Sequence, residues 1–410
     1  MSAPAKPMLS VREALDFMLA QAHPPKATEV VPTLNANGRV LAEAQASTVN
    51  VPSADNTQMD GYAVRAADCA SGDTTLTVTQ RIPAGKVGHF LATGNAARIF
   101  TGAMIPEGAD AVVMQEQCEA AEPNLVTIKH TPKSGEWIRR AGEDIVAGSV
   151  ILAGGTRLRS QELGLAASVG LANLPVYRKL RVAVFFTGDE LVMPGESLAP
   201  GAIYNSNRFL LRALLENLGC TLTDFGIVPD TLEATRATLR NAARENDLII
   251  TSGGVSVGEE DHIKPAVEAE GRLNMWQIAV KPGKPLAFGE VDRAGGSAFF
   301  LGLPGNPVSS FITFLLFVRP FILKLQGVSG TLEPRSFAMR ADFDWIKADR
   351  RNEFLRVRYN DAGGLELFPN QGSGVLTSTV WGDGLVDNPP GRAIAAGDTV
   401  RFIPFSELLH

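Results

Sequence analysis

The chain has 410 residues, of which 45% are hydrophobic and 20% charged, and its formal net charge at pH 7 is −6. At about 100–200 residues per domain, this length predicts two to four domains. The composition is typical of a globular protein with a sizeable core, which excludes a wholly disordered chain. A general nucleic-acid binder is disfavoured, because neutralising a phosphate backbone takes clustered Lys and Arg.

The cysteines and the apolar runs indicate the compartment. Cys69, Cys118 and Cys220 are too few and too scattered for a disulfide framework, and no Cys-x-x-Cys pair or closely spaced histidines indicate structural zinc. The N-terminus lacks the apolar core of a secretory signal. The longest apolar run, Phe311 to Leu323, contains an arginine and a proline and is shorter than the ~20 residues that a membrane span needs. We therefore expect a cytoplasmic protein with no membrane segment.

The N-terminal part predicts two helices separated by a β-rich unit. Residues 8–23 place apolar side chains at a helical period, and Ser10 is suited to cap that helix. Residues 161–171 also have a helical pattern, and we expect the two helices to pair across the β-rich unit, which makes this unit an insertion. Its predicted strands are Leu76–Thr79, Ala97–Phe100, Ala111–Met114 and Leu125–Lys129.

From residue 180 onward, strands alternate with helices. Apolar strands are predicted at 180–186, 222–228, 247–250, 275–280 and 298–303, and helices at 208–218, 232–244 and from 308. Such alternation predicts a doubly wound α/β domain, with a parallel sheet covered on both faces. Ligands of these sheets bind beyond the carboxyl ends of the strands.

The last 80 or so residues predict a small all-β domain. Its strand candidates are 336–341, 354–359, 365–367 and 399–403, separated by Gly and Asp turns. The chain is therefore predicted to be a multidomain α/β plus β protein. The expected units are an elongated N-terminal linker domain (1–48 and 140–178), an inserted β-rich domain (49–139), an α/β domain (179–327) and a C-terminal β-barrel domain (328–410).

Three loops at the predicted strand ends carry acidic residues. Glu190, Asp230 and Asp261 follow three successive strands of the α/β domain. Carboxylates gathered at one sheet edge repel each other unless a cation or a proton separates them. Because Mg²⁺ needs only one or two carboxylates plus phosphate oxygens, we favour a divalent metal shared with a phosphorylated ligand. The alternative is that these residues only cap helices or solubilise loops.

Further loops of the same domain are suited to anions. The two glycines of Ser252-Gly253-Gly254 permit positive φ, so that successive N–H groups could cradle an anion, although the segment matches neither G-x-G-x-x-G nor the phosphate loop. In Lys281-Pro282-Gly283-Lys284-Pro285 the lysines are point charges on a stiff segment, unless this is only a solvated turn. Pro304-Gly305-Asn306-Pro307 precedes a helix whose free N–H groups favour an anion, unless it is only a rigid connection.

The β-rich unit also contains polar loops, around Asp60, around Thr101 and at Arg139-Arg140. Their spacing names no reaction, and the arginine pair suits either an anion or a surface ion-pair cluster. No Ser-His-Asp order, activated cysteine or H-E-x-x-H is present. The residues alone therefore indicate a metal- and phosphate-ligand enzyme with carboxylates at an α/β sheet edge.

Six motifs in order resemble the MoeA family, the molybdopterin molybdenumtransferases, to which the C-terminal domain of gephyrin is related. They are residues 59–63 (MDGYA), 100–113 (FTGAMIPEGADAVV), 187–191 (TGDEL), 252–258 (SGGVSVG), 281–285 (KPGKP) and 303–307 (LPGNP). The resemblance implies a homodimer of four-domain subunits, with a molybdopterin-binding fold at about 180–327. It also implies that molybdate enters adenylylated molybdopterin at the dithiolene and that AMP is released with the help of Mg²⁺.

The resemblance also assigns residues, with each active site lying between two subunits. Glu190, Asp230 and Asp261 become the carboxylates that hold the metal in the α/β domain, and Asp60 and Thr101 come from the facing subunit. The phosphates, molybdate and pterin are assigned to Ser252, Gly253, Gly254, Lys281, Lys284, Pro304, Pro307, Ser373 and one of Arg139 and Arg140. Departures from the family pattern at Ser53-Ala54, Gln58 and Met104-Ile105 affect loop shape, because Asp60, Thr101 and the glycines are retained.

Two alternatives remain at this point. One is a MogA-type molybdopterin adenylyltransferase, although such proteins usually lack the N-terminal β insertion and the C-terminal β domain. The other is a non-catalytic scaffold like gephyrin, although a scaffold has no chemical need for clustered carboxylates. For the transferase, the expected partners are a second copy of the chain, a molybdopterin adenylyltransferase and apo-molybdoenzymes.

Overall fold

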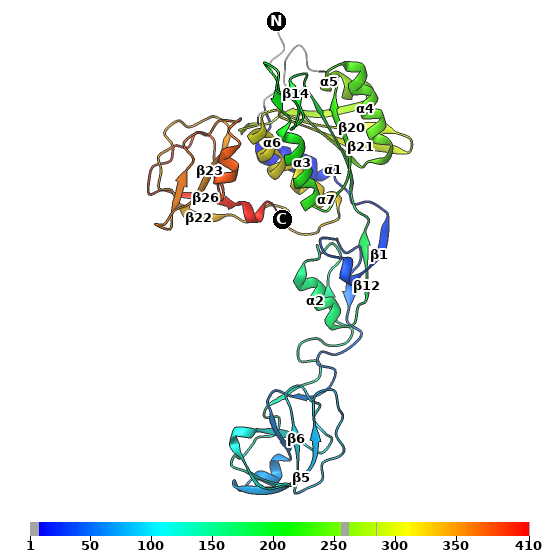
Figure 1. Cartoon of the computed structure of the whole chain (residues 1–410), viewed down its shortest axis with the longest axis vertical. Coiled ribbons are helices and arrows are strands. Elements are labelled where there is room, and N and C mark those ends of the chain that lie inside the picture. The colour runs from blue at the N-terminus through cyan, green and yellow to red at the C-terminus, as the bar shows by residue number, and fades with distance from the viewer. Residues whose placement is uncertain (1–7, 256–261, 284, 410) are drawn as a thin grey trace.

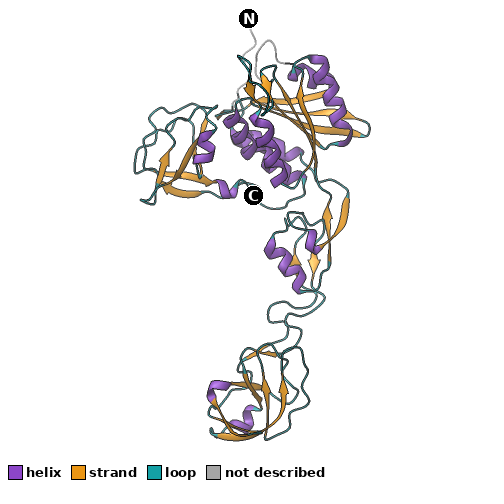
Figure 2. Ribbon diagram, viewed as in Figure 1, coloured by secondary structure: helices purple, strands orange, loops and turns teal. Residues whose placement is uncertain are grey.

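The structure is a computed structural model that describes residues 8–255, 262–283 and 285–409. The chain forms four units in an extended arrangement (Figure 1). An α/β unit lies at one end, with the C-terminal β unit beside it, and a narrow linker leads to a β-rich unit at the far end (Figure 2).

A six-stranded sheet forms the centre of the α/β unit, in the order β16-β13-β17-β21-β20-β18. The first four strands are parallel, but β20 and β18 run antiparallel to their neighbours, so the prediction of a purely parallel sheet was wrong. A hairpin explains the difference, because Arg293 pairs with Gly296 across a two-residue turn whose Gly295 has φ +83°. The strands are β13 (Arg181–Thr187), β16 (Thr221–Val228), β17 (Leu248–Ser252), β18 (Gly271–Gln277), β20 (Pro285–Arg293) and β21 (Gly296–Leu303).

Helices cover both faces of this sheet, as the apolar strands predicted. The helices are α3 (Ser206–Asn217), α4 (Leu232–Glu245), α5 (Ile263–Glu270), α6 (Pro307–Thr313) and α7 (Arg319–Leu325). One hydrophobic cluster joins a sheet face to α3, α6 and α7, and a second joins the other face to α4 and α5. The stretch Pro307–Leu325 is long and apolar enough to span a membrane, but 94% of its most apolar 18-residue window is buried inside the protein, where it belongs to the first cluster.

Helix α1 (Val11–Gln21) begins at the predicted cap, where the Ser10 Oγ accepts a hydrogen bond from the Glu13 N–H at 3.2 Å. Its buried residues Ala14, Leu15 and Met18 pack into the core of the α/β unit. The predicted pairing of α1 with α2 (Ser160–Ser168) was therefore wrong, and the assignment of this helix to the linker is corrected, because its apolar side covers the sheet.

Paired strands join the linker across the insertion. The antiparallel pairs are β1 (Thr28–Pro32) with β12 (Asn173–Tyr177), β2 (Gln45–Ala46) with β11 (Val150–Leu152), and β3 (Asn56–Thr57) with β10 (Ile138–Arg139). The sheet of the β-rich unit follows the order β7-β4-β6-β5-β9-β8. These strands are β4 (Gly61–Val64), β5 (Thr74–Ile82), β6 (Asn95–Ile99), β7 (Ala111–Met114), β8 (Cys118–Glu122) and β9 (Leu125–Ile128). All four predicted segments correspond to strands, although two of the predictions extend one residue too far, to Phe100 and to Lys129.

The C-terminal unit is hydrogen-bonded directly to the α/β unit. Its sheet order is β19-β23-β25-β26-β22, with β24 also paired to β23, and β19 (Val280–Lys281) is supplied by the α/β unit. The other elements are β22 (Phe337–Arg340), β23 (Asn352–Tyr359), β24 (Leu365–Leu367), α8 (Thr377–Trp381), β25 (Gly384–Asn388) and β26 (Thr399–Pro404). This shared sheet brings C-terminal loops to the edge where ligands of α/β sheets bind.

Candidate active site

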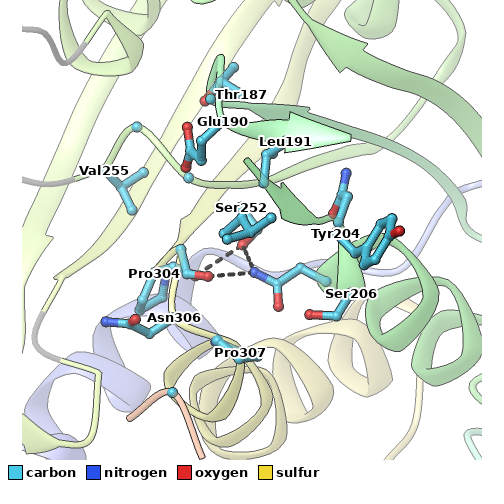
Figure 3. Close-up of a pocket in the computed structure, with 18 of the residues that line it drawn as sticks. Thr187, Glu190, Leu191, Tyr204, Ser206, Ser252, Val255, Pro304, Asn306 and Pro307 are labelled. Atoms are coloured by element: carbon cyan, nitrogen blue, oxygen red, sulfur yellow. Dashed lines mark hydrogen bonds between the residues drawn. The ribbon is translucent and has the colours of Figure 1, made fainter. Parts of the chain in front are cut away.

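A cavity of about 590 Å³ lies beyond the carboxyl ends of the parallel strands. The loops after β13, β16, β17 and β21 all reach it, as the position of their strand ends predicts. Figure 3 shows Glu190, Val255 and Pro304 from three of these loops around the cavity. Among the predicted site residues it is lined by Glu190, Asp230, Ser252, Gly253, Gly254, Pro304 and Pro307. Seven predicted residues from four loops that are far apart in the sequence therefore share one cavity.

The glycines after β17 are required by the close approach of another chain segment. Gly253 has φ +102°, and a Cβ there would lie 2.4 Å from the Thr187 carbonyl oxygen. Gly254 has φ +62°, and a Cβ would lie 2.9 Å from the Thr187 Oγ1. The predicted positive φ values are thus present, and the loop lies tightly against the end of β13.

A buried asparagine fixes the loops around the cavity. The Asn207 Nδ2 donates to the Ser252 Oγ at 2.8 Å and to the Gly305 carbonyl oxygen at 2.7 Å. The Ser252 hydroxyl in turn donates to the Pro304 carbonyl oxygen at 2.9 Å, as the dashed lines in Figure 3 show. Since Ser252 is only 2% exposed, its hydroxyl fixes loop positions here.

Two of the three predicted metal ligands lie at the first cavity. Glu190 and Asp230 line the same cavity, whereas Asp261 lies outside the described residues. The described part of the chain holds no group of three or more His, Cys, Asp or Glu side chains that could bind a metal. Two carboxylates beside the buried Thr187 hydroxyl, which has no partner among the described residues, form the all-oxygen donor set that suits Mg²⁺ with phosphate oxygens completing its shell.

A second cavity of about 460 Å³ adjoins the first, and Pro285, Pro304, Gly305 and Asn306 line both. Lys281 and Ser373 line the second cavity, as does Arg351. The Lys281 Nζ lies 3.0 Å from Glu353 Oε1 and 3.2 Å from Asp349 Oδ2, so this lysine is no solvated turn residue. Lys284 lies outside the described residues. A carboxylate-lined cavity therefore adjoins one lined by cations.

A buried arginine shapes the C-terminal wall of these cavities. Arg356 is 1% exposed and donates to the Ser378 Oγ at 3.0 Å and to the Gly372 carbonyl oxygen at 3.1 Å. Burial lowers its pKa to about 10. The Ser373 carbonyl oxygen accepts from the Val308 N–H at 3.0 Å. The loop at 371–374 is therefore held by Arg356 of β23 and by the first turn of α6.

The two residues predicted in the β-rich unit contact each other and not these cavities. The Asp60 Oδ1 accepts from the Thr101 N–H at 2.8 Å and from the Thr101 hydroxyl at 2.7 Å. These two hydrogen bonds lower the pKa of Asp60 below its ordinary value, and the bond from the Thr101 N–H has the larger effect. Within one chain the pair belongs to the unit farthest from the α/β sheet (Figure 1).

The predicted arginines also belong to the β-rich unit. The Arg140 Nη1 forms an ion pair with Asp55 Oδ2 at 2.6 Å, which is the surface alternative considered for this pair. Arg139 is exposed on β10. Neither lines the two cavities within one chain.

Other residues of the site were not predicted from the sequence. Asn205 and Asn207 sit at the start of α3, where the Asn205 side chain caps the helix, and the pattern for caps alone would have found only that role. Arg356 lies within a predicted strand, and an arginine among apolar residues of a strand could have indicated a buried charge. Arg351 and Gly374 line cavities without any distinguishing pattern.

The chain was compared with known families. The "MoeA N-terminal region (domain I and II)" matches residues 9–170, the "probable molybdopterin binding domain" matches 183–324, and the "MoeA C-terminal region (domain IV)" matches 338–405. A curated protein of Haemophilus influenzae named molybdopterin molybdenumtransferase is 42% identical over 98% of this chain and 100% of its own length. One of Nostoc sp. with the same name is 38% identical over 90% of this chain and 86% of its own.

Solved structures agree with these matches. Two crystal structures described as the molybdopterin biosynthesis MoeA protein of Pyrococcus horikoshii each cover 97% of this chain. They cover 100% and 99% of their own chains, with TM-scores of 0.84 and 0.79 and sequence identities of 29% and 31%. The multidomain α/β plus β fold class is thereby confirmed.

Proposed function

The chain belongs to the MoeA family of molybdopterin molybdenumtransferases, enzymes of molybdenum cofactor synthesis that insert molybdenum into molybdopterin, and we propose the details of its reaction. The proposed substrates are adenylylated molybdopterin and molybdate. AMP is released, and Mg²⁺ takes part. The observation that carries the proposal is the pair of adjoining cavities, one lined by Glu190 and Asp230 and the other by Lys281 and Arg351. Their volumes of about 590 and 460 Å³ lie within the range of small-molecule sites.

The residues divide the work by charge. Glu190 and Asp230 would hold Mg²⁺, which when bound supplies neutralisation of phosphoryl oxygens during loss of the adenylate. The Gly253-Gly254 turn lets phosphate oxygens approach the backbone closely, because neither residue carries a Cβ. The Gly253 N–H itself donates to the Leu303 carbonyl oxygen at 3.3 Å. Lys281 and Arg351 attract the molybdate anion into the second cavity, next to Ser373. Because Pro304 to Asn306 line both cavities, molybdate and pterin would meet there.

The site is completed by a second subunit in this proposal. Asp60 and Thr101 are held together but are remote from the cavity of their own chain, so they can reach a cavity only in a partner (Figure 1). The linker exposes large apolar side chains, among them Val30 at 71% and Leu34 at 92%, which suit subunit contact. We propose a homodimer in which the β-rich unit of each chain faces the α/β unit of the other and offers Arg139 or Arg140 to the anion.

The setting of the reaction follows from its substrates. A molybdopterin adenylyltransferase must supply the adenylylated pterin, and apo-molybdoenzymes receive the product, so we place the protein in the cytoplasm with no nucleic acid or membrane partner. The two alternatives, a MogA-type adenylyltransferase and a gephyrin-like scaffold, receive less support. The Haemophilus influenzae relative, which aligns with 98% of this chain, is named molybdenumtransferase.

The proposal is tested with purified protein, adenylylated molybdopterin, molybdate and Mg²⁺. We expect molybdate-dependent AMP release and activation of an apo-molybdoenzyme. Glu190→Gln should abolish both, whereas Glu216→Gln, the same change on the exposed face of α3, should leave both intact. Formation of adenylylated product from ATP would favour the adenylyltransferase. Peptide binding without any pterin or molybdate binding would favour the scaffold.

A further inference from the structure

A buried carboxylate of the C-terminal unit contacts the lysine of the second cavity. Glu353 is 1% exposed and lies on β23, opposite Lys281 of β19 in the parallel pairing that joins the two units. Its Oε1 accepts from the Lys281 Nζ at 3.0 Å, and its Oε2 accepts from the Trp345 Nε1 at 2.8 Å. Glu353 does not line either cavity, so any effect on a bound anion passes through Lys281.

The number of donors on the lysine makes this arrangement directional. An ammonium group has three N–H donors, and here one donates to Glu353 Oε1 at 3.0 Å, while Asp349 Oδ2 is an ion-pair partner 3.2 Å from the same nitrogen. At least one donor is left for a ligand, and Lys281 lines the cavity with its side chain 37% exposed. A lysine side chain otherwise loses much of its rotamer freedom when a ligand orders it. Contact with a rigid buried carboxylate removes that freedom before the ligand arrives.

We propose that Glu353 is a positioning residue that holds the Lys281 ammonium at the wall of the second cavity, with one N–H left for the incoming oxyanion. The predicted effect on molybdate binding rests on the function proposed above. The predicted ordering of the Lys281 side chain does not depend on that function. It assigns the C-terminal unit a part in oxyanion binding, because the carboxylate that orders the lysine lies on β23 while the lysine itself lies on β19.

Glu353→Gln is the informative variant because an amide cannot replace both acceptor oxygens. If the amide oxygen faces Trp345 Nε1, the NH₂ group faces the ammonium, and if it faces the ammonium, the indole N–H loses its acceptor. We expect the KM for molybdate to rise about tenfold, on the scale of one lost charge-assisted hydrogen bond, with little change in kcat. Glu353→Asp, which keeps the charge, should recover part of the loss. The control is Asp342→Asn, which breaks an ion pair with Arg340 elsewhere in the C-terminal unit.

A double-mutant cycle separates positioning from a merely structural role. In a Lys281→Met background, Glu353→Gln should cause no further rise in the KM for molybdate, and the neutral pair also avoids an uncompensated buried charge. An equal rise in both backgrounds would overturn the proposal, and so would an unchanged KM in Glu353→Gln when Lys281→Met by itself raises the KM.

The order of the lysine is read independently of the reaction. In protein labelled with ¹³C at lysine Cε, the Lys281 signal, assigned by its absence from Lys281→Met, should relax as a rigid group in the wild type and as a mobile one in Glu353→Gln. An equally rigid signal in both would refute positioning. A signal released by Glu353→Gln together with an unchanged KM in Lys281→Met would uphold positioning and refute the role of Lys281 in the proposed function.

Discussion

Replacing Asn207 by alanine tests how the loops around the first cavity are held. The substitution removes two hydrogen bonds, to the Ser252 Oγ at 2.8 Å and to the Gly305 carbonyl oxygen at 2.7 Å. At about 1 kcal/mol each, plus the cost of leaving a buried acceptor without a donor, local stability should fall by about 2–4 kcal/mol. Because the same loops carry the ligand-facing residues, molybdenum insertion should fall as well.

Hydrogen–deuterium exchange is the suitable assay, since it reports local opening in a multidomain chain. Amides of β17 and of the start of α6 should exchange roughly 30- to 1000-fold faster in Asn207→Ala, as 2–4 kcal/mol requires. The control is Asn217→Ala, the same change at an exposed position of α3. Unchanged exchange around β17, or equal acceleration in the control, would refute the reasoning.

Two further variants address the loop and a unit boundary. Gly253→Ala should lower molybdenum insertion at least tenfold while the sheet stays folded, because φ +102° disfavours a Cβ that would lie 2.4 Å from the Thr187 carbonyl oxygen; activity close to wild type would contradict this. Asp247→Asn should cost about 2–3 kcal/mol at pH 7, because Asp247 accepts from Arg178 at 2.7 and 2.8 Å, and urea unfolding measures this. Burial alone would raise the pKa of Asp247, but the hydrogen bonds from Arg178 and from the Arg181 N–H, together with the charges of both arginines, lower the pKa below its ordinary value. The stabilisation is therefore present above the unfolded pKa of about 3.9 and is lost as pH falls through the lower folded pKa. If the unfolding free energies of wild type and Asp247→Asn differed by the same amount down to about pH 2, this reasoning would be refuted.

Local patterns were sufficient to predict most of the α/β sheet. Strands such as β13 and β17 contain runs of consecutive apolar residues, and helices such as α4 have a clear period. Both the elements and the sheet edge that carries Glu190 and Asp230 could therefore be predicted. Strand β20 was missed because Glu290, Asp292 and Arg293 interrupt its apolar pattern near the hairpin. The partner of α1 was mispredicted because an apolar stripe predicts burial but not the surface that covers it.

The candidate site shows the same limit. Residues whose backbone geometry is special, such as Gly253 and Pro304, could be predicted because few other residues adopt those conformations. Asn207 and Glu353 could not, because their roles depend on contacts with residues 45 and 72 positions away that only the folded chain brings together. Polar side chains in helices and strands look alike in sequence whether they face solvent or a buried partner.

Mixing two inactive variants tests the shared site most directly. Asp60→Asn and Glu190→Gln homodimers should each fail to insert molybdenum, since the first lacks the contribution of the β-rich unit and the second that of the α/β unit. In a refolded equimolar mixture, half of the dimers are mixed and each mixed dimer has one intact site, so about one quarter of the wild-type rate should return. A mixture that stays inactive although mixed dimers form, or a fully active chain that is monomeric at assay concentration, would contradict a site built from two subunits.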